Sequence, residues 1–282
     1  MNETSPQVLT TVAEVRSALA DASGNGARPV VLVPTMGALH EGHLSLVKRA
    51  QEVPGAVVVV SIFVNPLQFA AGEDLDAYPR TFDADVEKLA GVGADFVFAP
   101  TPTVMYPAGP RTVIHPGPVA TILEGKTRPT HFAGVLTVVN KLFNLTKCTH
   151  AVFGEKDYQQ LLVIRQMVED NNMDLEIIGA PIVREDSGLA RSSRNTYLSE
   201  AERELATTLS KALAAGAAEH TAEEVLAAAR AVLDAAPAIE LEYLELLGAD
   251  LGERVVGENR LLVAARVGAT RLIDNCAVTL SA

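Results

Sequence analysis

Residues 29–43 read PVVLVPTMGALHEGH and contain the strongest structural signal in the chain. The first five of these residues are apolar without a break, which predicts a parallel strand buried on both faces of a sheet. A turn follows this strand, and a helical stretch is expected over residues 42–52, ended by Pro54 and Gly55. A strand that leads through a turn into a helix is the first half of a βαβ unit, and such folds bind ligands at the carboxyl ends of their strands.

Two histidines lie at the start of this helix. His40 and His43 are three residues apart, so their side chains point the same way on the first helical turn. Gly42 lies between them and lets a ligand approach the backbone closely. The helix start adds unpaired N–H donors and partial positive charge, which suits phosphate. The alternatives are two ordinary histidines or a metal site, although no third ligand stands at useful spacing for a metal.

Strands and helices continue to alternate along the first two thirds of the chain. Strands are expected at residues 56–64, 95–99, 150–153 and 175–178, and helices at about residues 83–89, 132–145 and 157–170. This alternation predicts an α/β fold with a Rossmann-like, doubly wound parallel sheet.

The pattern changes after about residue 183. Ser199 with Glu202, and Thr221 with Glu224, form capping boxes ahead of helices that are expected to reach about Ala214 and Ala235. Three stretches of alternating polar and apolar residues follow, at residues 239–246, 260–267 and 271–278. They predict a small antiparallel sheet with one solvent-exposed face. We therefore expect a Rossmann-like domain at residues 1–182 and a smaller α+β domain at residues 183–282.

Composition excludes several classes of function. The chain has 282 residues, a formal net charge of −12 at pH 7 and no run of Lys and Arg, so we expect no binding to nucleic acid. Its two cysteines, Cys148 and Cys276, have no metal-ligand spacing, which argues against a disulfide framework or a zinc site. Residues 1–7 lack a signal-peptide pattern, and no run of about 18 apolar residues could span a bilayer. We expect a cytoplasmic protein without a membrane partner.

The quoted motif resembles known proteins. His40-Glu41-Gly42-His43 resembles the His-x-Gly-His signature of the nucleotidyltransferase superfamily, and the longer string PTMGALHEGHLSLV resembles the pantothenate synthetase family. Other strings agree with this family in order and spacing: SIFVNPLQF (61–69), DLDAYPRT (74–81), HFAGVLTVV (131–139), FGEKDYQQL (153–161), VRE (183–185) and SSRNTYLS (192–199). The resemblance covers essentially the whole chain.

The resemblance implies an ATP-dependent ligase whose substrates are ATP, pantoate and β-alanine. In the family's reaction, the carboxylate of pantoate attacks the α-phosphorus of ATP and forms pantoyl adenylate with release of pyrophosphate. The amine of β-alanine then attacks the acyl carbon and yields pantothenate and AMP. Neither step needs a protein nucleophile, so positioning and cations can supply the catalysis. Magnesium is expected with ATP as the cosubstrate, and no tightly bound organic cofactor is expected.

Residues of two further motifs carry the ATP assignment. Lys156 follows the strand expected at residues 150–153, so it stands at a carboxyl end, where a lysine can reach phosphate oxygens; a solvated surface lysine is the alternative. Ser192, Ser193 and Arg194 resemble the superfamily's second signature, which grips the triphosphate, with a polar interdomain loop as the alternative. The resemblance implies catalytic roles for His40, His43, Lys156 and Arg194. It implies ATP contacts for Met36, Gly37, His40, His43, Gly154, Glu155, Lys156, Asp157, Val183, Arg191, Ser192, Ser193 and Arg194.

The other substrates are assigned mainly to amide side chains. Gln68 matches a position that binds pantoate and β-alanine in the family, and Gln160 matches one that binds pantoate. A neutral amide can hydrogen-bond a hydroxyl or a carboxylate without neutralising the attacking oxygen. Asn65 and Tyr78 are further substrate-binding candidates. An apolar wall for pantoate is expected from Met36, Phe63, Val135 and Val139, for which simple core packing is the alternative.

Two positions depart from the family pattern. The residue before the two serines is usually Met, and here it is Arg191. Asp83 and Asp85 offer possible magnesium ligands, of which we single out Asp85, but Ala84 interrupts the acidic run. The resemblance also implies a homodimer, with the first domain catalytic and the second acting as a lid.

Other functions remain open from the residues alone. A nucleotidyltransferase that stops after nucleotide transfer is opposed by Gln68, Gln160 and the additional C-terminal domain. A non-catalytic nucleotide-binding protein is opposed by the intact motif residues. An aminoacyl-tRNA synthetase is opposed by the short, acidic chain.

Overall fold

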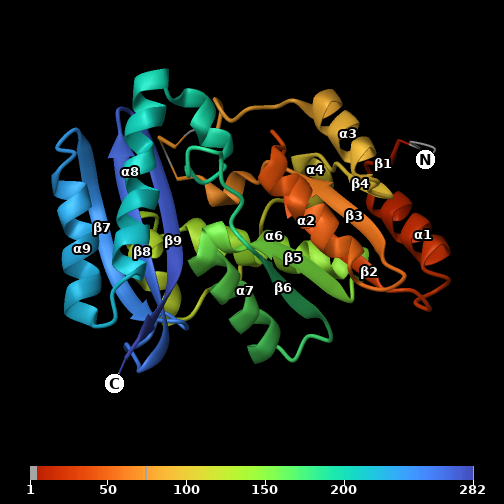
Figure 1. The fold of residues 1–282 in the computed structure, drawn as a ribbon. Coiled ribbons are helices and arrows are strands. Elements are labelled where there is room, and N and C mark those ends of the chain that lie inside the picture. Colours follow the sequence, from red (N-terminus) through yellow and green to blue (C-terminus); the bar gives the residue numbers. More distant parts are fainter. Residues whose placement is uncertain (1–4, 71, 74, 282) are drawn as a thin grey trace. The chain divides into compact units, whose positions relative to one another are not determined.

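The computed structural model describes residues 5–70, 72–73 and 75–281 of the chain (Figure 1). Its contacts divide the chain into two compact units. The six-stranded unit comprises Met1–Glu155 and Gln160–Pro181, and the three-stranded unit comprises Lys156–Gln159 and Ile182–Ala282. Asp74 and residues 1–4, which belong to stretches discussed above, lie outside the described residues.

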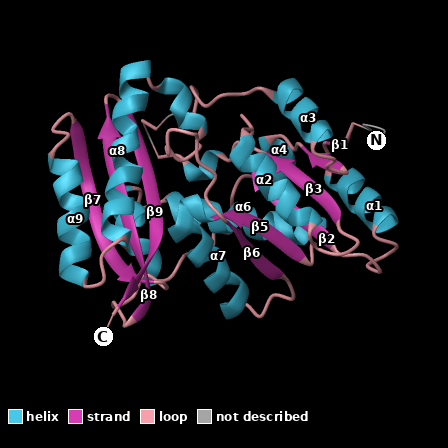
Figure 2. Cartoon of the chain, viewed as in Figure 1, coloured by secondary structure: helices cyan, strands magenta, loops and turns pink. Residues whose placement is uncertain are grey.

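The six-stranded unit is built on one sheet with the strand order β1-β4-β3-β2-β5-β6 (Figure 2). Its strands are β1 (Gln7–Leu9), β2 (Val30–Thr35), β3 (Val57–Ile62), β4 (Phe96–Phe98), β5 (His150–Gly154) and β6 (Glu176–Ala180). Every pairing is parallel. Because β3 and β4 lie on one side of β2 while β5 and β6 lie on the other, the predicted doubly wound parallel sheet is confirmed.

Helices cover both faces of this sheet. Residues of α1 (Val12–Ala22), α6 (His131–Thr146) and α7 (Tyr158–Asp170) pack on one face, and residues of α2 (Glu41–Gln51) and α3 (Phe82–Gly91) pack on the other. Short helical segments connect the rest: η1 (Pro66–Gln68), α4 (Pro102–Met105), η2 (Pro118–Thr121), α5 (Leu123–Thr127) and η3 (Glu155–Asp157). None of the helices in the described ranges is long and apolar enough to cross a bilayer.

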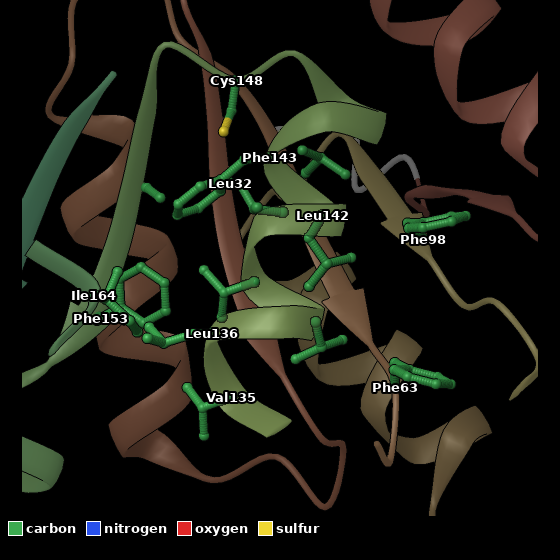
Figure 3. Packing of buried hydrophobic residues seen from close by; sticks show 14 of the residues in the cluster. Leu32, Phe63, Phe98, Val135, Leu136, Leu142, Phe143, Cys148, Phe153 and Ile164 are labelled. Atoms are coloured by element: carbon green, nitrogen blue, oxygen red, sulfur yellow. The ribbon is translucent and has the colours of Figure 1, made fainter. Parts of the chain in front are cut away.

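The central position of β2 in the sheet accounts for its unbroken apolar sequence. Its side chains alternate between the two faces, so Leu32 packs with the α6 cluster while Val31 and Val33 pack with the α2 cluster. Figure 3 shows Leu32 close to the ring of Phe143. That ring meets Phe153 at nearly a right angle, with 6.4 Å between ring centroids. Because both faces of the strand are buried, its sequence does not alternate between polar and apolar residues.

The three-stranded unit has the antiparallel order β7-β8-β9. Its elements are η4 (Ser193–Tyr197), α8 (Glu200–Ala217), α9 (Ala222–Asp234), β7 (Ile239–Gly248), β8 (Gly257–Val267) and β9 (Thr270–Leu280). Ser199 and Glu202 form the predicted capping box. Thr221 caps α9 through the amide of Glu224, but the Glu224 carboxylate bonds to the Thr221 hydroxyl instead of to the backbone.

The expectation of one solvent-exposed sheet face is wrong for β8. Residues 259–265 of this central strand are all buried. Part of the cover comes from residues 156–159, which belong to this unit: the guanidinium of Arg260 stacks 4.0 Å from the ring centroid of Tyr158. Asn275 also donates to the carbonyl of Lys156 at 3.0 Å. No local pattern could reveal this cover, because the covering residues are distant in sequence.

Helix α6 approaches η1 closely at Gly134. A Cβ atom at this position would overlap the carbonyl of Leu67 and would stand 2.9 Å from the amide nitrogen of Gln68. The carbonyl of Gly134 accepts from the Asn65 side chain at 3.1 Å. Glycine is therefore required here by space, not by backbone conformation.

We predict that Gly134→Ala destabilises the protein by about 1–3 kcal/mol, the usual scale of overpacking, although alanine is the better helix former. Gly91→Ala is the matched control, because a Cβ at this helical glycine meets nothing within 4 Å. Urea unfolding monitored by circular dichroism measures both variants. Equal unfolding midpoints for Gly134→Ala and the wild type would contradict the close approach.

Candidate active site

The turn after β2 has an unusual backbone. Gly37 and Ala38 are both left-handed, with φ of 83° and 50°. Glycine adopts this region freely, but for alanine it costs about 1–2 kcal/mol. Thr35 supports the turn, because its hydroxyl donates to the Ser61 carbonyl at 2.7 Å and accepts from the Gly37 amide at 3.3 Å.

A buried carboxylate from α3 holds this turn. Asp85 is 0% exposed, and its two oxygens accept from the amides of Ala38 at 2.9 Å and Leu39 at 2.8 Å. The hydroxyl of Thr81 donates to the same carboxylate at 3.1 Å. One turn further along α3, Lys88 donates to the carbonyl of Leu39 at 2.6 Å. Side chains of α3 therefore hold both the N–H groups and a carbonyl group of the backbone that leads into α2.

These contacts do not support Asp85 as a magnesium ligand. Both of its oxygens already accept backbone hydrogen bonds, and the group has no exposed surface. Within the described ranges, no group of three or more His, Cys, Asp or Glu side chains could hold a metal ion. Asp85 instead anchors the motif.

The two histidines of the motif cap α2. The Nδ1 atom of His40 accepts from the amide of Gly42 at 3.1 Å, and the Nδ1 atom of His43 accepts from the amide of His40 at 3.4 Å. Their ring centroids are 4.1 Å apart. Because a backbone N–H can only donate, each neutral ring must carry its proton on Nε2. Both histidines therefore offer Nε2–H as the donor side of the ring.

The motif lies at the point where the sheet reverses its winding. Strands β2 and β5 are neighbours in the sheet, and their parallel pairing brings their carboxyl ends to one edge. Gly154 ends β5 and Glu155 follows it. In doubly wound sheets, the ligand crevice forms where neighbouring crossovers lead to opposite faces. The structure thus brings Gly154 and Glu155 to the same edge as the His40–His43 turn.

The predicted substrate residues Asn65 and Gln68 follow the neighbouring strand β3. They are 0% and 8% exposed, and the Asn65 amide donates to Gln68 Oε1 at 3.0 Å. Asn65 also caps η1 by accepting from the amide of Leu67. Gln160 is half-buried on α7. Tyr78 is buried, and its ring packs edge-on against Phe69.

The apolar candidates are mostly core residues. Val135 and Val139 are 1% and 4% exposed and belong to the cluster around α6, together with Phe63. Figure 3 shows Val135 and Phe63 far from Cys148 within this cluster. Core packing accounts for their burial without a ligand. Met36, by contrast, is half-buried in the turn after β2.

Two residues that the sequence did not single out, Arg128 and His131, hold Gln68 by its main chain, and a third, Glu73, holds Arg128. Its carbonyl accepts from Arg128 Nη2 at 3.1 Å and lies 3.0 Å from His131 Nδ1. Arg128 also forms a two-pronged pair with Glu73, at 2.7 and 2.8 Å. The hydrogen bonds from Arg128 lower the pKa of Glu73 below its usual range. The only local signal was the position of His131 at the start of a family-like string.

The remaining ATP candidates belong to the three-stranded unit. Lys156 and Asp157 lie in η3, and the Lys156 ammonium is 3.6 Å from the Asp157 carboxylate. Ser192 is the N-cap of η4 and accepts from the amide of Arg194 at 3.2 Å. Ser193 lies half-buried in the same segment.

The second signature, residues 192–194, follows a hairpin that hydrogen bonds hold closed. The amide of Arg191 donates to the carbonyl of Val183 at 2.9 Å, which closes residues 183–191 into a hairpin. Glu185 accepts from Arg203 at 2.8 Å and from Asn195 at 3.2 Å. Sequence reasoning missed this Glu185–Arg203–Asn195 network, because its members are separated along the chain.

Comparison with known proteins identifies a family. A family model described as pantoate-beta-alanine ligase matches residues 7–277. The pantothenate synthetase of Corynebacterium jeikeium (strain K411) is 68% identical over 256 residues, which are 90% of this chain and 84% of that protein. The pantothenate synthetase of Nocardia farcinica (strain IFM 10152) is 62% identical over 260 residues, covering 90% of this chain and 81% of that protein.

Solved structures agree with this match. The crystal structure of pantothenate synthetase from Thermus thermophilus has a TM-score of 0.90 and 44% identity, and the match covers 97% of this chain and 99% of that one. A pantoate-beta-alanine ligase from Francisella tularensis, solved in complex with beta-gamma ATP and beta-alanine, has a TM-score of 0.81 and 36% identity. That match covers 96% of this chain and 97% of the other.

We predict that Asp85→Asn lowers the free energy of unfolding by about 1–3 kcal/mol, because an amide NH₂ would face one of two buried backbone donors. Backbone hydrogen exchange at Ala38 and Leu39 should accelerate. Asp83→Asn is the matched control: this exposed residue of the same helix should change stability by less than about 0.5 kcal/mol. Unchanged exchange at both amides in Asp85→Asn would contradict the anchoring role.

Proposed function

The chain belongs to the pantoate-beta-alanine ligase family, and we propose that its chemistry takes place at the carboxyl ends of β2 and β5. The protein condenses (R)-pantoate with β-alanine and consumes ATP. The observation that carries the location is the pair of Nε2–H donors of His40 and His43 at the start of α2, beside the point where the sheet reverses its winding.

The reaction has two balanced steps. A carboxylate oxygen of pantoate bonds to the α-phosphorus of ATP while the bond from that phosphorus to the bridging oxygen breaks, and pyrophosphate leaves. The amine of β-alanine then bonds to the acyl carbon of pantoyl adenylate, AMP leaves with its bridging oxygen, and the amine loses a proton. Charge accumulates on phosphate oxygens in the first step, so preorganised donors and cations provide the main stabilisation.

The histidines are well suited to the first step. In our proposal, His40 and His43 donate through Nε2 to phosphate oxygens of ATP, while the start of α2 adds partial positive charge. Met36 and Gly37 line the approach to these donors. Support comes from the Nδ1 atoms, which accept backbone hydrogen bonds and so leave the proton on Nε2.

The other ATP contacts are proposed from family membership together with local chemistry. Lys156 and Arg194 are cations that can offset charge on the triphosphate. Hydroxyl and backbone donors are proposed from the second signature, and Asp157 and Val183 are proposed to lie near the adenosine. The full proposed set is Gly154, Glu155, Lys156, Asp157, Val183, Arg191, Ser192, Ser193 and Arg194.

Pantoate recognition is proposed for Gln68 and Gln160, with Gln68 also binding β-alanine. Asn65 and Tyr78 are proposed to shape the same site. Support for Gln68 comes from the number of groups that hold it, since a surface glutamine would not be fixed by both its side chain and its carbonyl. Val135 and Val139 contribute at most an apolar backing to this site.

Magnesium is proposed to enter with ATP as part of the cosubstrate. We propose that it is held mainly by phosphate oxygens and water, which is the usual arrangement for magnesium bound with a nucleotide. Such an ion would offset charge on the triphosphate.

A homodimer and a cytoplasmic location complete the proposal. The family resemblance supports the dimer, and light scattering should give about twice the mass of one chain. Both Cys148 and Cys276 are free thiols, which suits a reducing compartment. Burial raises the pKa of each thiol to about 11, so neither is expected to react as a thiolate near neutral pH.

Exchange of labelled pyrophosphate into ATP tests the proposed function. The purified protein should catalyse exchange when pantoate is present and β-alanine is absent, because adenylate formation is reversible. Omission of pantoate should abolish the exchange. Absence of exchange with pantoate, together with absence of AMP release when both substrates are present, would contradict the proposal.

We predict that His43→Ala and Lys156→Ala each lower turnover by at least about 100-fold, the scale of losing one electrostatic contact in a transition state. Two matched controls are His150→Ala, at the amino end of β5, and Lys211→Ala, on the exposed surface of α8. Both controls should retain turnover within about twofold. A near-normal rate in either test variant would remove that residue from the mechanism.

A further inference from the structure

The orientation of the Asn65 side chain is determined by two backbone groups. Its Oδ1 atom faces the amide of Leu67 at 3.3 Å, and its Nδ2 atom faces the carbonyl of Gly134 at 3.1 Å. A backbone N–H can only donate and a backbone carbonyl can only accept. The reversed amide would place oxygen against oxygen and N–H against N–H, so one orientation is strongly preferred.

This orientation sets that of Gln68. The second proton on Asn65 Nδ2 points to Gln68 at 3.0 Å, so the facing atom of Gln68 must be its oxygen, Oε1. The carbonyl of Gln68 is held independently by Arg128 and His131. Because the carbonyl and Oε1 of Gln68 already accept hydrogen bonds within the protein, its Nε2 group is the part that can donate to a ligand.

Tyr106 completes the arrangement from the other side. Its hydroxyl donates to Asn65 Oδ1 at 2.9 Å. Burial raises the pKa of Tyr106 to about 12, so the hydroxyl keeps its proton and remains a donor throughout the neutral range. The ring packs 6.2 Å from Phe63 and lies under the ammonium of Lys141 at 5.6 Å, which positions the hydroxyl.

We propose that Tyr106 is a positioning residue for pantoate: its hydroxyl reinforces the orientation of Asn65 that the backbone groups determine, and Asn65 holds the amide of Gln68 with its NH₂ toward the substrate. Gln68 then recognises an acceptor oxygen of pantoate, either its carboxylate or a hydroxyl. This inference rests on the proposed assignment of Gln68 to pantoate. Tyr106 thereby takes part in pantoate binding, and Gln68 acts as a hydrogen-bond donor through Nε2.

The polarity has a chemical consequence. A glutamine that presented Oε1 would favour a hydroxyl donor and would repel a carboxylate. A glutamine that presents Nε2–H attracts a carboxylate by hydrogen bonding. Because an amide does not ionise, it transfers no proton to the carboxylate oxygen. The attacking oxygen therefore keeps its nucleophilic electron pair, which the first step of the reaction requires.

Tyr106→Phe tests the proposal, because phenylalanine keeps the ring contacts with Phe63 and Lys141 and removes only the hydroxyl. We predict that the KM for pantoate in pyrophosphate exchange rises about 3–10-fold, the effect of one hydrogen bond of about 1 kcal/mol. The KM for ATP should stay within about twofold. Tyr243→Phe, on β7, is the matched control and should leave both KM values unchanged.

A double-mutant cycle separates positioning from general structural support. If Tyr106 acts through Gln68, then Tyr106→Phe should have little further effect on the KM for pantoate in a Gln68→Ala background. Thermal unfolding of Tyr106→Phe is measured alongside, so that partial unfolding is recognised. Gln68→Glu, which lacks the NH₂ donor, should raise the KM for pantoate at least as much as Gln68→Ala.

Two results would overturn this inference while leaving the proposed function intact. One is pantoate-dependent exchange in the wild type with an unchanged KM in Tyr106→Phe. The other is the same fold-change for Tyr106→Phe in the presence and absence of the Gln68 side chain. Absence of exchange in the wild type would overturn both the proposed function and this inference.

Discussion

The hydrogen bonds from Ala38 and Leu39 to the buried carboxylate of Asp85 are the constraint on which the candidate site depends. Burial of a carboxylate is costly unless hydrogen bonds replace its water, and here two backbone amides and one hydroxyl do so. In return, the turn keeps two successive left-handed residues, of which Ala38 would not adopt this conformation by preference. The turn leads directly into His40. The position of the first helical turn of α2 at the sheet edge therefore depends on a side chain of α3.

In two places of the six-stranded unit, backbone groups decide which atoms of a polar side chain are available to a ligand. Amides at the start of α2 occupy the Nδ1 atoms of His40 and His43, so both rings present Nε2–H. The amide of Leu67 and the carbonyl of Gly134 determine the orientation of Asn65 in the same way. A reaction that uses no protein nucleophile gains most from donors that are already oriented before the substrates bind. Preorganisation by the main chain provides this without additional catalytic groups.

Local sequence patterns were sufficient to predict the arrangement of strands and helices, but not the contacts between residues that are distant in sequence. The unbroken apolar run of β2 and the following histidine turn predicted the sheet, its crossover and the edge where the motif lies, because each signal is contained in a few consecutive residues. The role of Asp85 could not be recognised, because its partners lie on a different element; an acidic residue early in a helix more often suggests a surface or a metal. Tyr106 was missed for the same reason. The buried face of β8 was missed because residues 156–159 cover it from a distant part of the chain.

This protein activates the carboxylate of pantoate as an acyl adenylate. Pantoate labelled with ¹⁸O in both carboxylate oxygens tests this most directly, with AMP analysed by ³¹P NMR or mass spectrometry after one turnover with ATP and β-alanine. We predict that AMP carries one ¹⁸O atom and pyrophosphate carries none, because the attacking oxygen stays on phosphorus when the acyl carbon is released. Unlabelled AMP, or label in pyrophosphate, would contradict the claim.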